Sequence, residues 1–418
     1  MLNGTTPIVN SDRPRLVFVV NSSLAVGFLQ GQLQYFQSQG FDVTVVCPKR
    51  KQNEWEVPKP EGVSIVEVEM ERNIAPLRDL VSLWRLWRII RTLRPAITNV
   101  GTPKAGLLGG LAAWINRVPC RYYTLHGLRF ETTKGLRRRI LIFAERLACR
   151  FAHRVICVSH STHEKAITSG LTSEEQTLVF GSGSCNGVDC SRFASTPKRV
   201  NQAAALRCQL GIPARANVVT FVGRLTVDKG IPELAEAFLK LDEKFPDQWL
   251  LLVGCFEDED PLPVNTRKFL ESHPRVIFSG PVRDTSIYYA ASDVVVLPSH
   301  REGLPTVILE AQAAGIPVVG SSATGIVDVV MHGETGLLFP TGDVSALADT
   351  LARLITDNAL AARLVRAGRE SVNQRFRQEA VWEAHLREYI GLLQTKEPNP
   401  LSVRKAGKQT RLVVRSNE

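Results

Sequence analysis

Several features that mark membrane-spanning, secreted and metal-binding proteins are missing from this chain of 418 residues. No uncharged apolar run reaches the ~20 residues that a spanning helix needs. The first residues, MLNGTTPIVNSDRP, lack the basic-then-apolar order of a signal peptide. The eight cysteines form no C-x-x-C pair, so we expect most of them to be small core residues rather than metal or redox groups. These absences predict a folded, cytoplasmic protein.

What the chain does contain is a globular composition with an uneven charge. Hydrophobic residues make up 44% and charged residues 22%, and the length predicts two domains rather than one core. Residues 1–200 hold 27 basic and 15 acidic residues, whereas the remainder holds 24 and 26. We therefore expect the first half to face something negative, such as nucleic acid, an anionic membrane surface or a phosphorylated substrate.

Predicted strands and helices alternate twice along the chain. RLVFVV (15–20) indicates a buried strand, 21–27 a loop, 28–39 a helix ending at Gly40, and DVTVVCP the next strand. The alternation restarts at NVVTFVGR (217–224). This pattern predicts an α/β fold of two Rossmann-like, doubly wound domains that face each other across a cleft, at residues 1–200 and 201–377. We expect 378–394 to be a helix that can pack back on the first domain, and 395–418 a disordered tail.

Two glutamates bracket the start of a predicted helix in SHREGLPTVILEAQAAGIPVV (299–319). Proline suits a first helical turn, so the helix should begin near Pro305, with Glu302 on the preceding loop and Glu310 on the second turn. The amides of Gly303, Leu304 and Thr306 then form an anion cradle suited to a diphosphate. The alternative is that both glutamates only complement the helix dipole on an ordinary surface helix.

A second motif, FVGRLTVDKG (221–230), supplies two cations at a strand end of the same predicted sheet. Arg224 and Lys229 could neutralise a diphosphate leaving group without a metal, although such a loop is often merely solvated. The nearby acidic loop EDED contains Asp258-x-Asp260, which has the form of a metal-binding pair. We expect that loop to be solvated instead.

These two stretches, with TGIVDVVMHGETGLLFPTGD (324–343), resemble the motifs of retaining family-4 glycosyltransferases of the GT-B fold. The resemblance implies that Arg224 and Lys229 hold the diphosphate of a nucleotide sugar, Glu310 its ribose and Glu302 the sugar hydroxyls. It implies a nucleotide-sugar-binding second domain, closure of the two domains, and no metal or other cofactor. The residues expected to bind the donor are Gly27, Gly223, Arg224, Lys229, Glu302, Gly303, Leu304, Pro305, Thr306 and Glu310.

The first domain would then bind the acceptor. His126 follows the predicted strand RYYTLHG, where the family often has a histidine that contacts the donor sugar, although a lone histidine is more often structural. We count it with Glu302, Arg224 and Lys229 as a candidate catalytic residue. TPKAGLLGGLAA (102–113) and GSGSCNGVDCSRF (181–193) resemble stretches of bacterial enzymes that build surface polysaccharides or lipid-linked oligosaccharides. The candidate acceptor-binding residues are Asn21, Ser22, Ser23 and Arg129.

Two basic helical patterns suit a membrane surface. Residues 77–94 gather apolar positions 77, 80, 84, 87 and 90 on one face beside Arg78, Arg85 and Arg88. Residues 134–154 repeat the pattern with Arg137, Arg138 and Arg139 and with Arg146, Arg150 and Arg154. Near anionic lipid each such residue contributes about 1 kcal/mol, although the first pattern also fits a helix packed on a sheet. A polyprenyl-diphosphate sugar is the acceptor that fits this face.

The sequence therefore predicts a retaining glycosyltransferase at the inner face of the cell membrane. It would move a hexose or N-acetylhexosamine from a nucleotide diphosphate, UDP by preference, to a lipid-linked sugar. The alternatives are a transferase with a soluble small acceptor, a nucleotide-sugar epimerase on the same fold, and a non-catalytic partner of another transferase. A nucleic-acid partner is disfavoured, because it would require aromatic residues interleaved with basic ones on an exposed surface. The aromatic residues, which make up 7% of the chain, fall mostly in apolar runs.

Overall fold

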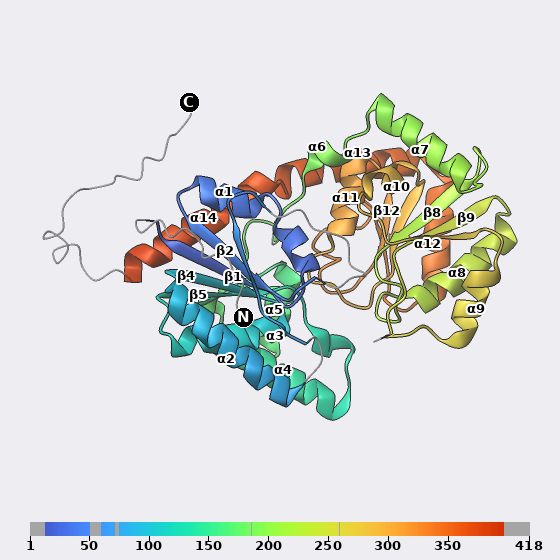
Figure 1. Cartoon of the computed structure of the whole chain (residues 1–418). Coiled ribbons are helices and arrows are strands. Elements are labelled where there is room, and N and C mark those ends of the chain that lie inside the picture. Colours follow the sequence, from blue (N-terminus) through green and yellow to red (C-terminus); the bar gives the residue numbers. More distant parts are fainter. Residues whose placement is uncertain (1–12, 51–59, 72–74, 185, 259, 397–418) are drawn as a thin grey trace, which may run out of the picture.

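The computed structural model describes residues 13–50, 60–71, 75–184, 186–258 and 260–396. They form two domains, each built on a parallel sheet that is covered by helices (Figure 1). The first sheet has the strand order β3-β2-β1-β4-β5-β6-β7 and the second the order β10-β9-β8-β11-β12-β13. The predicted pair of Rossmann-like α/β domains is thereby confirmed. Among the described residues, no helix combines the length and apolarity needed to cross a membrane.

The first domain alternates strands and helices as the sequence predicts. Its strands are β1 (Arg15–Val19), β2 (Asp42–Cys47), β3 (Ser64–Glu67), β4 (Ile97–Gly101), β5 (Cys120–Leu125), β6 (Arg154–Cys157) and β7 (Thr177–Leu178). Its helices are η1 (Leu24–Leu29), α1 (Gln32–Ser38), α2 (Pro76–Leu93), α3 (Pro103–Ile115), η2 (Arg129–Thr132), α4 (Gly135–Phe151), α5 (His160–Thr168) and η3 (Glu174–Gln176).

The second domain follows the same plan. Its strands are β8 (Asn217–Val222), β9 (Gln248–Val253), β10 (Val276–Gly280), β11 (Val294–Leu297), β12 (Val318–Ser321) and β13 (Leu337–Phe339). The helices of this part of the chain are α6 (Cys190–Phe193), α7 (Pro197–Gln209), α8 (Ile231–Lys244), α9 (Val264–Ser272), α10 (Ser286–Ala290), α11 (Thr306–Ala314), α12 (Val344–Thr356), α13 (Asn358–Arg375) and α14 (Gln378–Lys396).

Side chains of successive residues on β1 enter opposite cores, as the period of two in a strand requires. Val17 and Val19 belong to the core that α2, α3 and α4 cover. Leu16 and Phe18 belong to the core on the other face, with residues of α1 and with Tyr389 of α14. Both faces of the first sheet are therefore buried, which explains why its strands read as continuous apolar runs.

The segment after β1 differs from the sequence prediction. Residues 24–29 form the short 3-10 helix η1 instead of a loop, and α1 covers only part of the expected helix 28–39. Gly31 separates the two with φ of +82°, a conformation that glycine adopts without strain. A Cβ there would lie 2.7 Å from the ring of Trp382 in α14. The close approach of α14 therefore explains the break.

The chain crosses between the domains twice, and the two crossings lie together. Val188 forms a parallel bridge with Arg377, and the Val188 amide donates to the Phe376 carbonyl at 2.8 Å. The expected domain border between residues 200 and 201 falls inside α7, which packs on α10, while α6 packs on α11. By their packing, both helices belong with the second sheet.

After α13 the chain returns to the first domain. α14 packs on α1 and β5, and the buried Tyr389 hydroxyl accepts a hydrogen bond from Asn99 Nδ2 at 2.6 Å. The prediction of a disordered tail from residue 395 was wrong for its first two residues, since α14 continues to Lys396. Residues 397–418 of that tail lie outside the described residues.

Candidate active site between the two domains

The carboxyl edge of the second sheet brings the two sequence motifs together. β8 and β11 pair directly, with Val219 opposite Val294, although 74 residues separate them in the chain. The loops that follow these strands, 223–230 and 298–305, are therefore neighbours at the point where the strand order reverses. Ligands of doubly wound sheets bind at such switch points.

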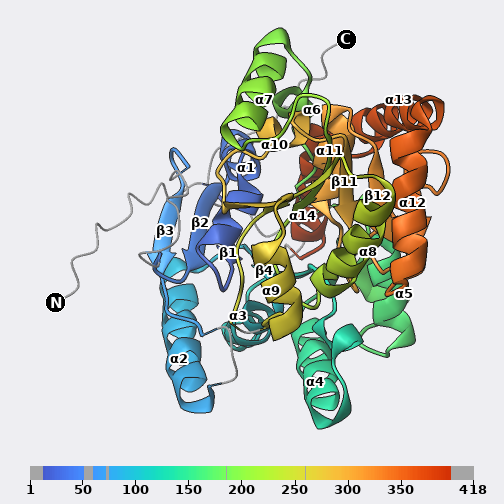
Figure 2. The same ribbon diagram turned by 90° about the vertical axis from the view of Figure 1, so that its right-hand side faces the viewer.

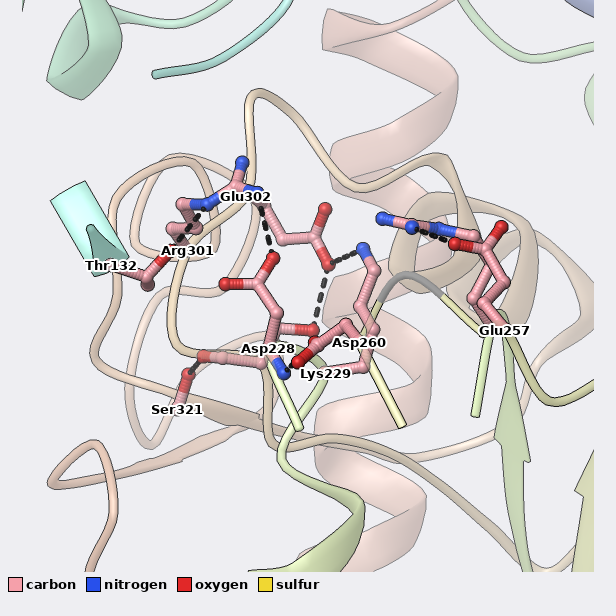
Figure 3. Close-up of polar contacts among 10 residues, drawn as sticks. Thr132, Asp228, Lys229, Glu257, Asp260, Arg301, Glu302 and Ser321 are labelled. Carbon is pink, nitrogen blue, oxygen red and sulfur yellow. Dashed lines mark hydrogen bonds and ion pairs between the residues drawn. The ribbon is translucent and has the colours of Figure 1, made fainter. Parts of the chain in front are cut away.

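Lys229 and Glu302 form an ion pair at this edge (Figure 3). Lys229 Nζ lies 2.5 Å from Glu302 Oε1, and the side chains are only 17% and 14% exposed. The Ser299 hydroxyl donates to the same oxygen at 2.7 Å. Gly230 allows the loops to meet, because a Cβ there would lie 2.2 Å from the Pro298 carbonyl oxygen. The structure thus joins two predicted site residues and adds Ser299, which the sequence prediction missed.

Arg224 is also paired, with a residue of the acidic loop. Its Nη1 lies 2.6 Å from Glu257 Oε2 in the loop after β9. Asp260 Oδ2 in the same loop accepts from the Asp228 amide at 2.8 Å, whereas Asp258 is exposed. Our expectation of a merely solvated loop was wrong for Glu257 and Asp260. The reason is the strand order, since β9 lies beside β8 and their following loops meet.

Glu310 occupies a separate place on α11. The helix begins at Thr306 after Pro305, as the sequence predicts, and leaves Gly303 and Leu304 in the preceding loop. The Tyr289 hydroxyl donates to Glu310 Oε2 at 2.8 Å. Burial raises the pKa of this carboxyl above its usual value, and the bond from Tyr289 opposes that shift. The first-turn amides of α11 lie between the two glutamates in sequence and carry the positive end of the helix dipole.

His126 lies where the first domain touches the second. It follows β5, and its Nε2 approaches Gly101 at the end of β4, where a Cβ would lie 2.9 Å away. Burial lowers the pKa of His126 to about 4, so the imidazole is neutral at pH 7 and can donate or accept a hydrogen bond. A Cβ at Gly303 would lie 1.9 Å from the His126 carbonyl oxygen, so only glycine permits this approach.

The other first-domain candidates share this edge of the first sheet. Asn21, Ser22 and Ser23 follow the carboxyl end of β1, and Gly27 lies within η1. Arg129 begins η2, two residues before Glu131, and its charge opposes the rise that burial causes in the pKa of Glu145. The structure places all of them on loops that follow β1 and β5, which flank β4 in the sheet.

Side chains that the sequence prediction missed join the two domains. Thr324 Oγ1 donates to Glu131 Oε1 at 2.7 Å, and Arg301 Nε donates to Thr132 Oγ1 at 3.1 Å. The Ser161 amide donates to Asp328 Oδ1 at 3.1 Å. All six residues lie in or next to strand-end loops, which is the only signal that the sequence carries for them.

Exposed apolar and basic residues lie on α2 and α4, which both pack on α3 and project from the first domain in the same direction (Figure 2). The face that α2 buries contains Ser82, Leu86 and Ile90. Leu77 and Trp84, expected on one face with residue 90, are instead 81% and 55% exposed. We call the following residues the apolar rim: Leu77, Leu80, Val81, Trp84, Leu136, Ile140 and Phe143.

Basic residues accompany the apolar rim, and all but one of those predicted are exposed. They are Arg78, Arg85 and Arg88 on α2, and Arg137, Arg138, Arg139, Arg146 and Arg150 on α4. Arg154 is not on this helix: it begins β6, where it donates to the Glu175 carbonyl at 2.6 Å and lies 3.7 Å from Glu388. The predicted spacing of four from Arg150 thus crosses the end of the helix, which removes Arg154 from the set that was predicted to face a membrane.

Comparison with known proteins identifies the family. Residues 203–371 match the model described as glycosyl transferases group 1, and residues 28–181 match a glycosyl transferase 4-like domain. The chain is 33% identical over 369 residues to the capsular polysaccharide biosynthesis glycosyltransferase CapM of Staphylococcus aureus, covering 88% of this chain and 95% of that protein. It is 31% identical over 292 residues to the UDP-Gal:alpha-D-GlcNAc-diphosphoundecaprenol alpha-1,3-galactosyltransferase of Escherichia coli, covering 69% and 74%.

Solved structures agree on the fold. HepE of Anabaena in complex with UDP-glucose superposes with a TM-score of 0.74 at 22% identity, covering 91% of this chain and 99% of that one. The sucrose-phosphate synthase of Thermosynechococcus elongatus gives 0.75 at 22% identity, covering 92% and 100%. This chain therefore belongs to the group 1 glycosyltransferases, with two Rossmann-like domains in the GT-B arrangement.

Proposed function

We propose that this glycosyltransferase moves a hexose or N-acetylhexosamine from a UDP-linked donor to a lipid-linked sugar in the synthesis of a bacterial polysaccharide, with retention of the anomeric configuration. The observation that carries the proposal is the largely buried Lys229–Glu302 pair, with Arg224 on the same loop as Lys229 and with Glu302 in the loop that leads into α11. Two cations and a helix amino terminus suit a diphosphate, and a fixed carboxylate suits sugar hydroxyls.

The donor is placed by these groups in a definite order. Arg224 and Lys229 hold the two phosphates, so that no metal ion is required to neutralise the leaving group. Glu310 accepts from the ribose hydroxyls, and Glu302 accepts from hydroxyls of the transferred sugar. Support for a UDP donor comes from the similar fold of HepE, which was solved with UDP-glucose, and from the UDP-sugar named for the E. coli relative.

Retention follows if the acceptor hydroxyl attacks the face from which the diphosphate leaves. The bond from the acceptor oxygen to the anomeric carbon forms as the bond from that carbon to the phosphate oxygen breaks. The acceptor proton passes to the departing phosphate oxygen, and Arg224 and Lys229 stabilise the charge that develops there. His126 remains neutral at pH 7 and would contribute a hydrogen bond to the donor sugar rather than a charge.

The acceptor would reach the site from a membrane. The apolar rim and the exposed Arg137 and Arg139 combine the two properties that hold a protein at an anionic surface, at about 1 kcal/mol for each basic residue near the lipid. α2 and α4 run antiparallel to the strands they follow, so their amino-terminal halves lie towards the cleft edge of the first sheet. We place the protein at the cytoplasmic face of the membrane, with a polyprenyl-diphosphate sugar as acceptor.

The donor site is tested by nucleotide binding. Purified protein is incubated with UDP-, GDP- and ADP-sugars in the presence of EDTA, and its thermal stability and slow donor hydrolysis are followed. We expect stabilisation by UDP-sugars, lost in Lys229→Ala and kept in Lys268→Ala, which changes an exposed lysine on α9. Binding that required a divalent metal, or no binding at all, would contradict the donor site. Release of an epimerised sugar nucleotide would favour the epimerase instead.

The membrane surface is tested by vesicle flotation. We expect the protein to float with phosphatidylglycerol vesicles at low salt and less so at high salt. A double variant of the apolar rim, Leu80→Ser with Phe143→Ser, should lose this binding. The matched control, Leu239→Ser, removes a leucine of 45% exposure from α8 in the second domain and should leave it unchanged. Equal flotation of the double variant and the control would remove the membrane from the proposal.

A further inference from the structure

We propose that Arg301 is a positioning residue that links closure of the two domains to the placement of Lys229. This inference rests on the proposed function, because it assigns Lys229 to the donor diphosphate. Arg301 immediately precedes Glu302 and is 18% exposed. The sequence prediction did not select it.

The guanidinium of Arg301 bridges the domains (Figure 3). Its Nη2 lies 2.8 Å from Asp228 Oδ2 in the loop after β8, and its Nε donates to Thr132 Oγ1 of η2 at 3.1 Å. The first contact lies within the second domain and the second contact crosses to the first. A planar guanidinium holds two donors at a fixed angle, so the position of Thr132 influences the orientation that Arg301 presents to Asp228.

Asp228 is the residue next to Lys229, and it is held on several sides. Its amide donates to Asp260 Oδ2 at 2.8 Å, and its carbonyl accepts from the His300 amide at 3.0 Å. Arg301 is the ion-pair partner of its side chain, which is 15% exposed, and its buried Oδ1 has no hydrogen bond in the part of the chain that the structure describes. Loss of Arg301 would leave the negative charge of this carboxylate without its ion-pair partner. This would destabilise the loop, because the group is too little exposed for water to replace that partner fully.

The neighbouring contact shows that η2 is a docking element rather than a chance neighbour. Glu131 accepts from Thr324 beside the Thr132 contact, so two successive residues of η2 bind two different loops of the second domain. Opening of the cleft would break both contacts. Arg301 would then keep one partner, and the loop that carries Lys229 would lose its tie to the first domain.

The sequence of contacts therefore runs from Thr132 through Arg301 and Asp228 to Lys229, which pairs with Glu302. Lys229 reaches its position against Glu302 most completely in the closed enzyme. Closing and forming a competent diphosphate site become one event, which limits hydrolysis of the donor in the open enzyme.

A double-mutant cycle on the full-length protein tests this coupling. Thr132→Val removes the acceptor oxygen with little change of shape. Arg301→Lys keeps a positive charge but lacks the planar guanidinium that can donate to Asp228 and Thr132 at once. We expect Thr132→Val to lower kcat about 5-fold and Arg301→Lys about 20-fold, from the loss of one and of two bonds to a charged group. The double variant should match Arg301→Lys, because both changes break the same link. The matched control is Arg267→Lys, whose partner Glu271 lies on the same exposed helix.

Small-angle scattering of the free protein supplies a readout that needs no substrate. We expect a larger radius of gyration for Thr132→Val and for Arg301→Lys than for wild type and the control, since both shift the protein towards the open form. Losses of kcat that multiply in the double variant would overturn the proposal, as would an unchanged radius in both single variants. If the radius rises as expected but wild type binds no nucleotide, the link between the domains stands and the proposed function fails.

Discussion

Replacing Lys229 by methionine should separate the stability of the second domain from its chemistry. Methionine keeps much of the length of the lysine side chain and removes its charge, so Glu302 loses its ion-pair partner and keeps only the hydrogen bond from Ser299. Removing one partner of a fully buried pair costs about 3–5 kcal/mol. Glu302 is 14% exposed and keeps one donor, so we expect about 2 kcal/mol.

This loss of free energy corresponds to a lower melting temperature, by an amount that depends on the size of the domain. For domains of this size, 1 kcal/mol corresponds to about 2–4 °C, so Lys229→Met should lower the melting temperature by about 4–8 °C. Adding Glu302→Gln removes the uncompensated charge and should recover most of that loss. Activity should not recover: kcat/KM for transfer should fall at least ~100-fold in both variants, since the cation that we propose for the diphosphate is missing.

Calorimetry and steady-state kinetics on the same preparations measure the melting temperature and kcat/KM of each variant. The control is Arg267→Met, whose partner Glu271 is 47% exposed, and it should change neither quantity appreciably. If Lys229→Met melts at the same temperature as wild type, the ion pair does not stabilise the domain as its burial implies. If the double variant regains activity, Lys229 does not act on the donor, and the assignment of the diphosphate site is refuted.

Three further outcomes follow from the buried and paired carboxylates. Glu310→Ala should lower kcat/KM at least ~100-fold through loss of the ribose contact, and turnover near that of wild type would contradict this role. Glu257→Gln removes the carboxylate that competes for Arg224, and because the pair is 37% and 21% exposed we expect UDP to bind only about 2- to 5-fold more tightly by calorimetry; weaker binding would show that Glu257 supports the site. Burial raises the pKa of Glu145 to about 7 from 4.5, so the stability it confers is full below about pH 4.5 and is lost as pH rises to about 7. Glu145→Gln should therefore be more stable than wild type at pH 8 by up to about 3 kcal/mol in denaturant titrations, and an equal or lower stability there would contradict the shift.

Much of the secondary structure was predictable because burial leaves a local pattern. The strands of the first sheet are covered on two faces, so they appear as short apolar runs, and α2 lies within one residue of the helical pattern at 77–94. η1 was missed because the cause of the break at Gly31 is Trp382, which lies far along the chain. A local pattern carries no information about such a neighbour.

The candidate site was likewise predictable from the sequence only in part. The strand-end positions of Arg224, Lys229 and Glu302 follow from the alternation of elements, and parallel strands place such ends at one edge. That Lys229 pairs with Glu302 depends on β8 lying beside β11. The adjacency of two strands that are not consecutive is a property of the sheet and not of either segment.

By itself the sequence determined the two-domain α/β architecture, the motif residues at the carboxyl edge of the second sheet and the concentration of basic residues in the first half, because each is written in composition or in local spacing. Only the tertiary structure decided that Glu257 pairs with Arg224 and that Arg301 joins Asp228 to Thr132. These contacts join segments that are far apart in the chain. Their partners are chosen by strand order and by the approach of the two domains, which no single segment encodes.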